Sequence, residues 1–123
     1  MKIDAPIITR DPSDAADLSS KIEASGFDGL CTFEGPHEPF LPLAVAASNT
    51  KKINLITSIA IAFARNPMLL ANIGYDLQLL SKGRFIMGLG SQIKPHIEKR
   101  FSMPWSSPAN RMREMIQAIK SIW

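Results

Sequence analysis

The short polar segment 34–38 concentrates side chains that can do chemistry, and it follows directly on an apolar run. Glu34, His37 and Glu38, together with His96, are of the types that bind metals, but their spacing matches no established metal signature. We therefore predict no metal site and interpret both histidines as residues of polar surface loops. Glu34 ends the apolar run, where a carboxylate can act as an acid, a base or a hydrogen-bond acceptor. An ion-pair partner or a residue at a helix N-terminus is an equally good interpretation of Glu34.

Two closely spaced glycines, Gly88 and Gly90, suggest a dinucleotide-binding turn. That fingerprint requires a third glycine and a helix that opens at once, whereas Ser91-Gln92 and a proline-containing loop follow here. A dinucleotide site of this type is therefore excluded. The glycines still allow a backbone to approach closely, either a ligand or a neighbouring strand.

The elements that must position these residues form four repeats of strand and helix. Strands are predicted over residues 4–8, 27–33, 53–62 and 84–90. The helices between them begin at cap-plus-proline pairs such as Asp11-Pro12, Asn66-Pro67 and Ser107-Pro108. A loop of about 16 residues follows the fourth strand, long enough to suggest a function.

Regular alternation of strands and helices indicates a parallel sheet with right-handed crossovers. Two architectures fit: a small doubly wound sheet, or the first four βα units of a (β/α)8 barrel. A complete barrel needs about 250 residues, and this chain has 123. We interpret residues 1–123 as one unit, the N-terminal half of such a barrel. In both architectures ligands meet the carboxyl ends of the strands.

Composition narrows the function classes. The net charge is +3, from 14 basic and 11 acidic residues, and the basic residues of 94–123 alternate with apolar ones at helical spacing. That pattern is typical of a solvated helix face, so no nucleic-acid partner is expected. No apolar run is long enough for a membrane span and no export signal is visible. The single Cys31 excludes an intramolecular disulfide, and we expect a cytoplasmic protein.

The whole chain resembles the N-terminal half of the luciferase-like monooxygenase superfamily. The long loop 91–107, with its Arg-Phe-Ser-Met-Pro-Trp stretch, most resembles the branch that uses coenzyme F420, a 5-deazaflavin. No single piece is diagnostic, but the ordered set is fairly specific. Its elements are Ala24-Ser25-Gly26-Phe27-Asp28-Gly29, Pro42-Leu43 to Thr50, the strand 53–62, Asn66-Pro67, Ser81-Lys82-Gly83-Arg84-Phe85 and Gly88-Leu89-Gly90.

The resemblance implies a barrel that holds a flavin or deazaflavin at its mouth. Ser58 and Ile59 match the end of the third strand, where family members carry a non-prolyl cis peptide against the cofactor ring. Ser91 and Gln92 match positions after the fourth strand that line the ring, and Gly90 is grouped with them as cofactor-binding.

Other positions match the family less closely. Glu34 matches a position that is often Asp in deazaflavin enzymes, and it is our candidate catalytic residue. Gly35 stands where those relatives often have His. Arg84 and Asp76 match family positions to which we assign scaffold ion pairing.

The implied activity is hydride transfer between a small organic substrate and coenzyme F420. An FMN-dependent monooxygenase is the alternative within the superfamily. Because barrel phosphate sites usually come from later strands, we expect the 123 residues alone to bind coenzyme weakly or not at all. A non-catalytic half-barrel that self-associates, or pairs with a complementing half, is the alternative of another class.

Overall fold

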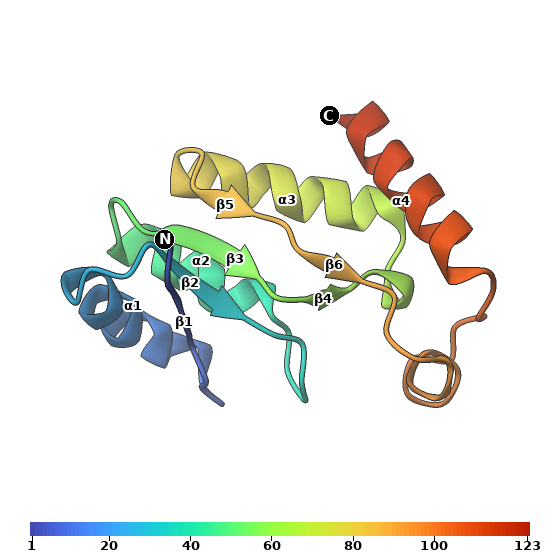
Figure 1. Ribbon diagram of the computed structural model, residues 1–123, viewed down its shortest axis with the longest axis horizontal. Coiled ribbons are helices and arrows are strands. Elements are labelled where there is room, and N and C mark those ends of the chain that lie inside the picture. The colour runs from blue at the N-terminus through green and yellow to red at the C-terminus, as the bar shows by residue number, and fades with distance from the viewer.

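The computed structural model describes residues 1–123 and contains a four-stranded parallel sheet in the order β1-β2-β3-β5. A second, two-stranded parallel sheet joins β4 to β6 further along the same direction (Figure 1). The strands are β1 Asp4–Pro6, β2 Gly29–Thr32, β3 Asn54–Thr57, β4 Ala60–Ile61, β5 Phe85–Ile86 and β6 Leu89–Gly90. The helices are α1 Ala15–Ala24, α2 Phe40–Asn49, α3 Pro67–Ser81 and α4 Pro108–Ile122, with 3-10 turns at Pro12–Asp14 and Ala62–Ala64 and a π-helical turn at His96–Arg100.

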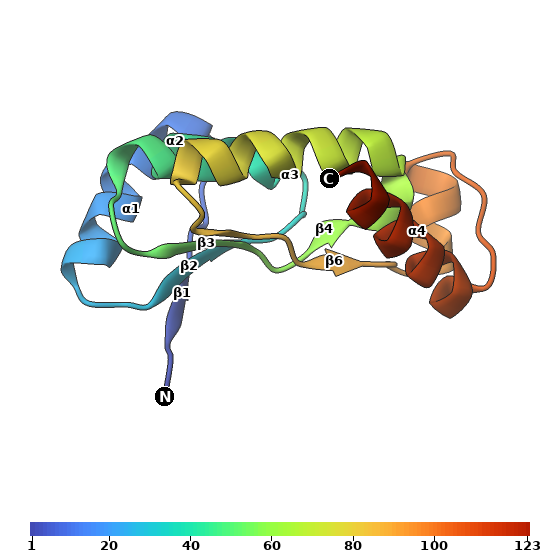
Figure 2. The ribbon, with the colours of Figure 1, turned by 90° about the horizontal axis from the view of Figure 1, so that it is seen from above.

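The layering distinguishes between the two architectures. Figure 2 shows α1, α2 and α3 together on one face of the sheet, with nothing covering the other face. A doubly wound sheet carries helices on both faces, whereas the inner face of a barrel sheet carries none. The fold is therefore a parallel α/β arrangement of the barrel type, and the prediction of four βα units is confirmed.

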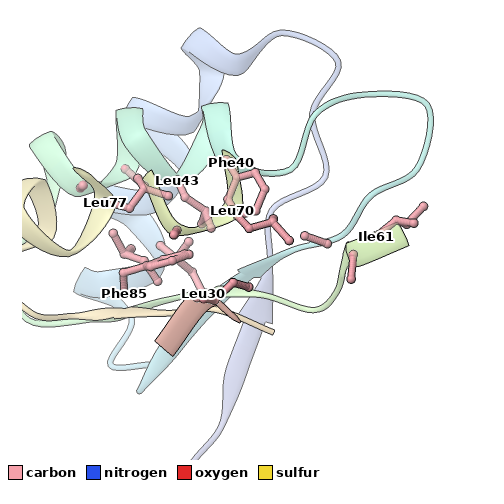
Figure 3. Packing of buried hydrophobic residues seen from close by; sticks show 14 of the residues in the cluster. Leu30, Phe40, Leu43, Ile61, Leu70, Leu77 and Phe85 are labelled. Atoms are coloured by element: carbon pink, nitrogen blue, oxygen red, sulfur yellow. The ribbon is translucent and has the colours of Figure 1, made fainter. Parts of the chain in front are cut away.

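Buried apolar residues lie between the sheet and the helices. Leu30 and Phe85 of the sheet pack against Phe40, Leu43 and Leu77 of the helices (Figure 3). On the open face the alternate residues of β2 and β3 are half-buried, and Ile86 of β5 and Phe33, which directly follows β2, are exposed. The sequence pattern therefore leaves one apolar face of the sheet without a cover.

Two of the three predicted helix starts are capped as expected. The Asn66 side chain accepts a hydrogen bond from the Leu69 backbone N–H at 2.9 Å, and Asp11 accepts one from Ser13 at 2.9 Å. Ser107 precedes Pro108 at the start of α4, but its side chain makes no capping hydrogen bond. The proline alone marks that start.

Two predicted strands are each divided in the structure. The run 53–62 forms β3 and β4, separated by a cis peptide between Ser58 and Ile59. The run 84–90 likewise forms β5 and β6. The cis peptide lies where the resemblance implies one. The prediction of two uninterrupted strands is wrong, because the segments 53–62 and 84–90 are each interrupted, at residues 58–59 and 87–88, where they lie side by side.

The amino end of the sheet is held by Arg84 and Glu23. Arg84 donates hydrogen bonds to the carbonyl oxygens of Ala47, Thr50, Ile53 and Ser81 at 2.8–3.1 Å. It makes no ion pair, so the predicted pairing of Arg84 is wrong, although its scaffold role is right. The Asp76 side chain also makes no ion pair.

Glu23, at the end of α1, accepts backbone hydrogen bonds from Lys51, Lys52 and Ile53 at 2.6–3.1 Å. Burial acts to raise the pKa of its carboxyl group. The three N–H donors and the nearby positive charge of Arg84 outweigh burial, so the net pKa is lowered. Glu23 thus fixes the turn that leads into β3.

Replacing Glu23 by Gln should lower the free energy of unfolding at pH 7 by about 1–2 kcal/mol, because hydrogen bonds to a charged acceptor are lost. A carboxyl group with a lowered folded pKa contributes stability above its unfolded pKa of about 4.3 and loses it as pH falls through the folded value. The difference between wild type and E23Q should therefore shrink in acid. Urea unfolding at pH 7 and pH 3 measures this, with E98Q as the surface control. Equal E23Q and E98Q effects would contradict the assignment.

Candidate active site at the carboxyl edge of the sheet

The carboxyl ends of β2, β3/β4 and β5/β6 meet at one edge of the structure. The Ser58 backbone N–H donates to the Thr32 carbonyl at 2.6 Å, and the Ala60 N–H donates to the Gly88 carbonyl at 2.9 Å. These bonds continue the sheet past the point where β3 bends. They bring the segments that carry the predicted site residues side by side.

Thr57 and Gly88 form the tightest contact at this edge. The Thr57 hydroxyl donates to the Gly88 carbonyl and accepts from the Gly88 N–H, both at 2.9 Å. A Cβ atom at position 88 would lie 2.0 Å from the Thr57 carbonyl oxygen, and one at Gly90 would lie 2.8 Å from Ile59 Cδ1. At both glycines the backbone closely approaches a neighbouring segment of the protein, which is one of the two interpretations of this motif.

Glu34 touches the same segment through both its backbone and its side chain. Its N–H donates to the Ile59 carbonyl at 3.1 Å, and its Oε2 accepts from the Ile61 N–H at 2.6 Å. The same oxygen lies 2.7 Å from Arg65 Nη1, and the Glu34 side chain is only 4% exposed. The ion-pair interpretation of Glu34 therefore describes its geometry.

Arg65 binds two carboxylates at once. Its Nη2 lies 2.7 Å from Glu38 Oε2, and its guanidinium stacks over the Phe40 ring at 5.4 Å. Burial acts to lower the pKa of Arg65, but the two glutamates outweigh it and raise the pKa further. Since Phe40 belongs to the buried core, this cluster lies on the helix-covered side of the edge.

Sequence reasoning assigned no role to Arg65. The available signal was its position as the one charged residue that ends the apolar run 53–64. A cation in such a place needs a buried partner, and Glu34 and Glu38 are the carboxylates at the end of the preceding strand.

The predicted cofactor-binding residues fall into two groups. Ser58 is exposed and Ile59 half-buried, with the Ile59 side chain against Gly90. Because Ile61 pairs with Gly90, Ser91 lies about three residues, or about 10 Å, beyond Ile59 along the strand direction.

Gln92 follows in a left-handed conformation with φ of 60°, and its Oε1 accepts from the Ile93 N–H at 3.0 Å. The amide NH2 of Gln92 makes no hydrogen bond within the protein. It is therefore free to donate to a ligand at this edge.

The long loop after β6 packs closely beside the edge. Ile97 is fully buried, and the Trp105 ring meets the Phe63 ring edge-on with centroids 5.8 Å apart. Arg111 of α4 stacks over the same Phe63 ring at 4.3 Å, and Arg100 donates to the Gly35 carbonyl. The loop thus connects β6 to the loop after β2.

The histidines and the cysteine singled out in the sequence do not form a cluster of metal-binding side chains. No group of three metal-binding side chains lies together, and His37 and His96 are both exposed. Burial, with a smaller contribution from Asp4, raises the pKa of the Cys31 thiol, which therefore stays protonated at neutral pH. No helix is both long enough and apolar enough to cross a membrane.

Comparison with known proteins places the chain in a family. Residues 3–123 match the family model described as luciferase-like monooxygenase, and the chain belongs to that family. It is 61% identical over 109 residues to the uncharacterised protein Rv1360 of Mycobacterium tuberculosis, covering 89% of this chain and 32% of that protein. It is 33% identical over 113 residues to Rv3520c of M. tuberculosis, covering 91% and 33%, whose name assigns it provisionally to the coenzyme F420-dependent oxidoreductases. The chain thus spans about a third of these relatives' length.

Solved structures share the fold. A monooxygenase, RslO1, from Streptomyces bottropensis superposes with a TM-score of 0.87 at 21% identity, covering all of this chain and 43% of its own. The oxygenating component of 3,6-diketocamphane monooxygenase from Pseudomonas putida, in complex with FMN, gives 0.85 at 17% identity, covering 100% and 40%. The coenzyme F420-dependent tetrahydromethanopterin reductase of Methanopyrus kandleri gives 0.83 at 24%, covering 96% and 39%. The fold is therefore that of part of a luciferase-like barrel.

The two glycines should respond differently to replacement by Ala. Gly88→Ala forces a methyl group against the rigid Thr57 backbone and should cost about 3 kcal/mol of unfolding free energy or more. Gly90→Ala meets Ile59 Cδ1 and Cγ1 at 2.8–2.9 Å, which can yield by moving one side chain, and should cost about 1–2 kcal/mol. Urea denaturation followed by circular dichroism compares them, and equal losses would contradict the contact.

The Arg65 cluster predicts a second matched pair. Glu34→Gln removes the buried partner of Arg65 and should cost about 2–3 kcal/mol of unfolding free energy. Glu38→Gln removes a partner that is 39% exposed and should cost about 1 kcal/mol or less. Both variants are unfolded in urea at pH 7, and a larger loss for E38Q would overturn this ranking.

Proposed function

We propose that this chain forms the coenzyme wall of an oxidoreductase that transfers a hydride between a small organic substrate and coenzyme F420. The observation that carries the proposal is the convergence of Ser58–Ile59 and Gly90–Gln92 at the carboxyl edge of the sheet. Carboxyl edges of parallel strands are where barrel enzymes bind their ligands. A cytoplasmic location and a small-molecule substrate are part of the same proposal.

The residues present fit a planar ring system. Ile59 offers a half-buried apolar side chain, and Ser58 offers an exposed hydroxyl with no partner within the protein. Gln92 adds a free amide donor about 10 Å or more further on. Deazaflavin and flavin rings both carry carbonyl oxygens that accept from such donors. When bound, the coenzyme accepts or supplies the hydride, and the protein supplies orientation and electrostatics.

Coenzyme F420 is favoured over FMN by the relatives. Rv3520c, at 33% identity, and the F420-dependent glucose-6-phosphate dehydrogenase of Amycolatopsis mediterranei, at 27%, carry F420 in their names. The structure in complex with FMN is 17% identical to this chain, which supports the fold alone. FMN remains the alternative coenzyme, because the oxygenase component of the flavin-dependent trigonelline monooxygenase of Acinetobacter baylyi is also 33% identical, over a shorter stretch of 87 residues.

Glu34 was predicted to be catalytic, and we propose that it acts as a positioning residue. Its Oε2 already accepts from Arg65 and from the Ile61 N–H, and its side chain is only 4% exposed, so it offers little surface to a ligand. Through the Ile59 carbonyl and the Ile61 N–H it holds the backbone on both sides of Ala60. That backbone carries the Ile59 side chain.

A titration of the 15N-labelled chain with coenzyme F420 and with FMN tests the coenzyme. We expect weak binding, shifts at the Ile59, Ser91 and Gln92 amides, and an affinity for F420 at least tenfold higher than for FMN. Gln92→Asn keeps a residue that tolerates the left-handed conformation and should weaken F420 binding. Gln117→Asn, on the exposed surface of α4, is the control. Tighter binding of FMN than of F420, or shifts confined to residues away from Ile59, Ser91 and Gln92, would overturn the assignment.

The second candidate function is a half-barrel that pairs with a copy of itself or with a complementing half. The observation that favours it is the uncovered sheet face, on which Phe33 and Ile86 are about half exposed. Light scattering on the titrated samples separates the candidates. A discrete dimer that binds coenzyme supports a reconstituted barrel, and a dimer without coenzyme affinity supports a non-catalytic assembly.

A further inference from the structure

A cavity of about 580 Å3 lies between the loop after β1 and the loop after β2. Its size is within the range of small-molecule sites, about 300–1,000 Å3. Apolar side chains from both loops and from the start of α2 form its walls, among them Ile7, Ile8, Phe33 and Leu41. The cavity therefore suits a ligand with an apolar body.

Five polar side chains also line the cavity: Thr9, Arg10, Thr32, His37 and Glu38. The Glu38 carboxylate is bound to Arg65 at 2.7 Å, which neutralises it. The Thr9 hydroxyl is engaged by Asp14 at 2.8 Å. Arg10 makes no ion pair and no side-chain hydrogen bond, so its guanidinium is an unmatched positive charge at the wall. His37 stands in the other loop as a second nitrogen donor.

The cavity adjoins the proposed coenzyme wall. Thr32 lines the cavity, and its carbonyl oxygen accepts the hydrogen bond from the Ser58 N–H at 2.6 Å. Gly35, another lining residue, has its carbonyl oxygen bound by Arg100 of the long loop. A ligand in the cavity therefore lies one strand away from Ser58.

We infer that this cavity binds a small organic acid, with the apolar chain against Phe33 and Leu41 and the carboxylate on Arg10. A guanidinium binds a carboxylate through two parallel hydrogen bonds, which fixes its orientation as well as its charge. The binding site itself is independent of the coenzyme. We also assign this acid as the substrate of the proposed oxidoreductase, and that assignment alone rests on the proposed function.

Three probes of equal chain length test the inference by NMR titration of the 123-residue chain without coenzyme: hexanoate, 1-hexanol and hexylammonium. We expect hexanoate to shift the Ile8, Thr9 and Gly35 amides and to bind at least fivefold more tightly than 1-hexanol. Arg10→Gln should remove that preference. Arg113→Gln, which removes an exposed arginine of α4 that makes no ion pair, is the matched control and should keep the preference.

Several results would overturn the inference. These are equal affinity for hexanoate and 1-hexanol, tighter binding of hexylammonium, or an equal effect of the two arginine variants. Shifts confined to residues outside the two loops would also overturn it. The coenzyme titration reports on Ile59, Ser91 and Gln92 instead, so a failure of the proposed function and a failure of this site produce different spectra.

Discussion

The reciprocal hydrogen bonds between Thr57 and Gly88 are the contact on which the rest of the edge depends. They join two segments of the chain at the point where each leaves the four-stranded sheet. They also require that position 88 has no side chain. From this point β4 and β6 continue as a separate parallel pair. Ser58 and Ile59 lie between β3 and β4, yet the Ser58 N–H still donates to the Thr32 carbonyl and the Ile59 carbonyl still accepts from the Glu34 N–H. Their backbone is therefore held on both sides of the bend.

The carboxyl edge of the sheet carries paired charged side chains in one place and polar side chains without protein partners in another. On the helix-covered side, Glu34, Arg65 and Glu38 form a charged cluster against the Phe40 ring, in which Arg65 pairs with the buried Glu34 and with the more exposed Glu38. Away from this cluster, the Ser58 hydroxyl and the Gln92 amide NH2 have no protein partners. A strand places alternate side chains on opposite faces, so one short segment can serve as scaffold on one side and as ligand wall on the other. The positioning role proposed for Glu34 fits this arrangement, because its side chain belongs to the charged cluster.

Local signals predicted most of the fold. The pairs Asp11-Pro12 and Asn66-Pro67 marked helix starts because capping needs only neighbouring residues, and Gly26 and Gly83 take the positive φ values typical of helix ends. The strand breaks were missed because they depend on a contact across 31 residues, between Thr57 and Gly88. The choice of partner for Glu34 was missed for the same reason. Periodicity gives the face of a residue, whereas a salt bridge depends on what the folded chain brings opposite it.

The few contacts that Ile59 and Gln92 offer limit how tightly these residues alone could bind a coenzyme. Ile59 and Gln92 offer an apolar surface and one amide donor to a ring, and both contacts are neutral and partly exposed. Neutral hydrogen bonds contribute about 0.5–1.5 kcal/mol each, which is small beside the entropy lost on association. Tight binding of a phosphorylated coenzyme needs paired cations or backbone N–H groups for its phosphate. Arg65, Arg84 and Arg111 are already engaged by protein groups, and Arg10 lies away from Ile59 and Gln92, in the loop after β1. Under the proposed function, the edge would therefore orient a ring more effectively than it captures a coenzyme.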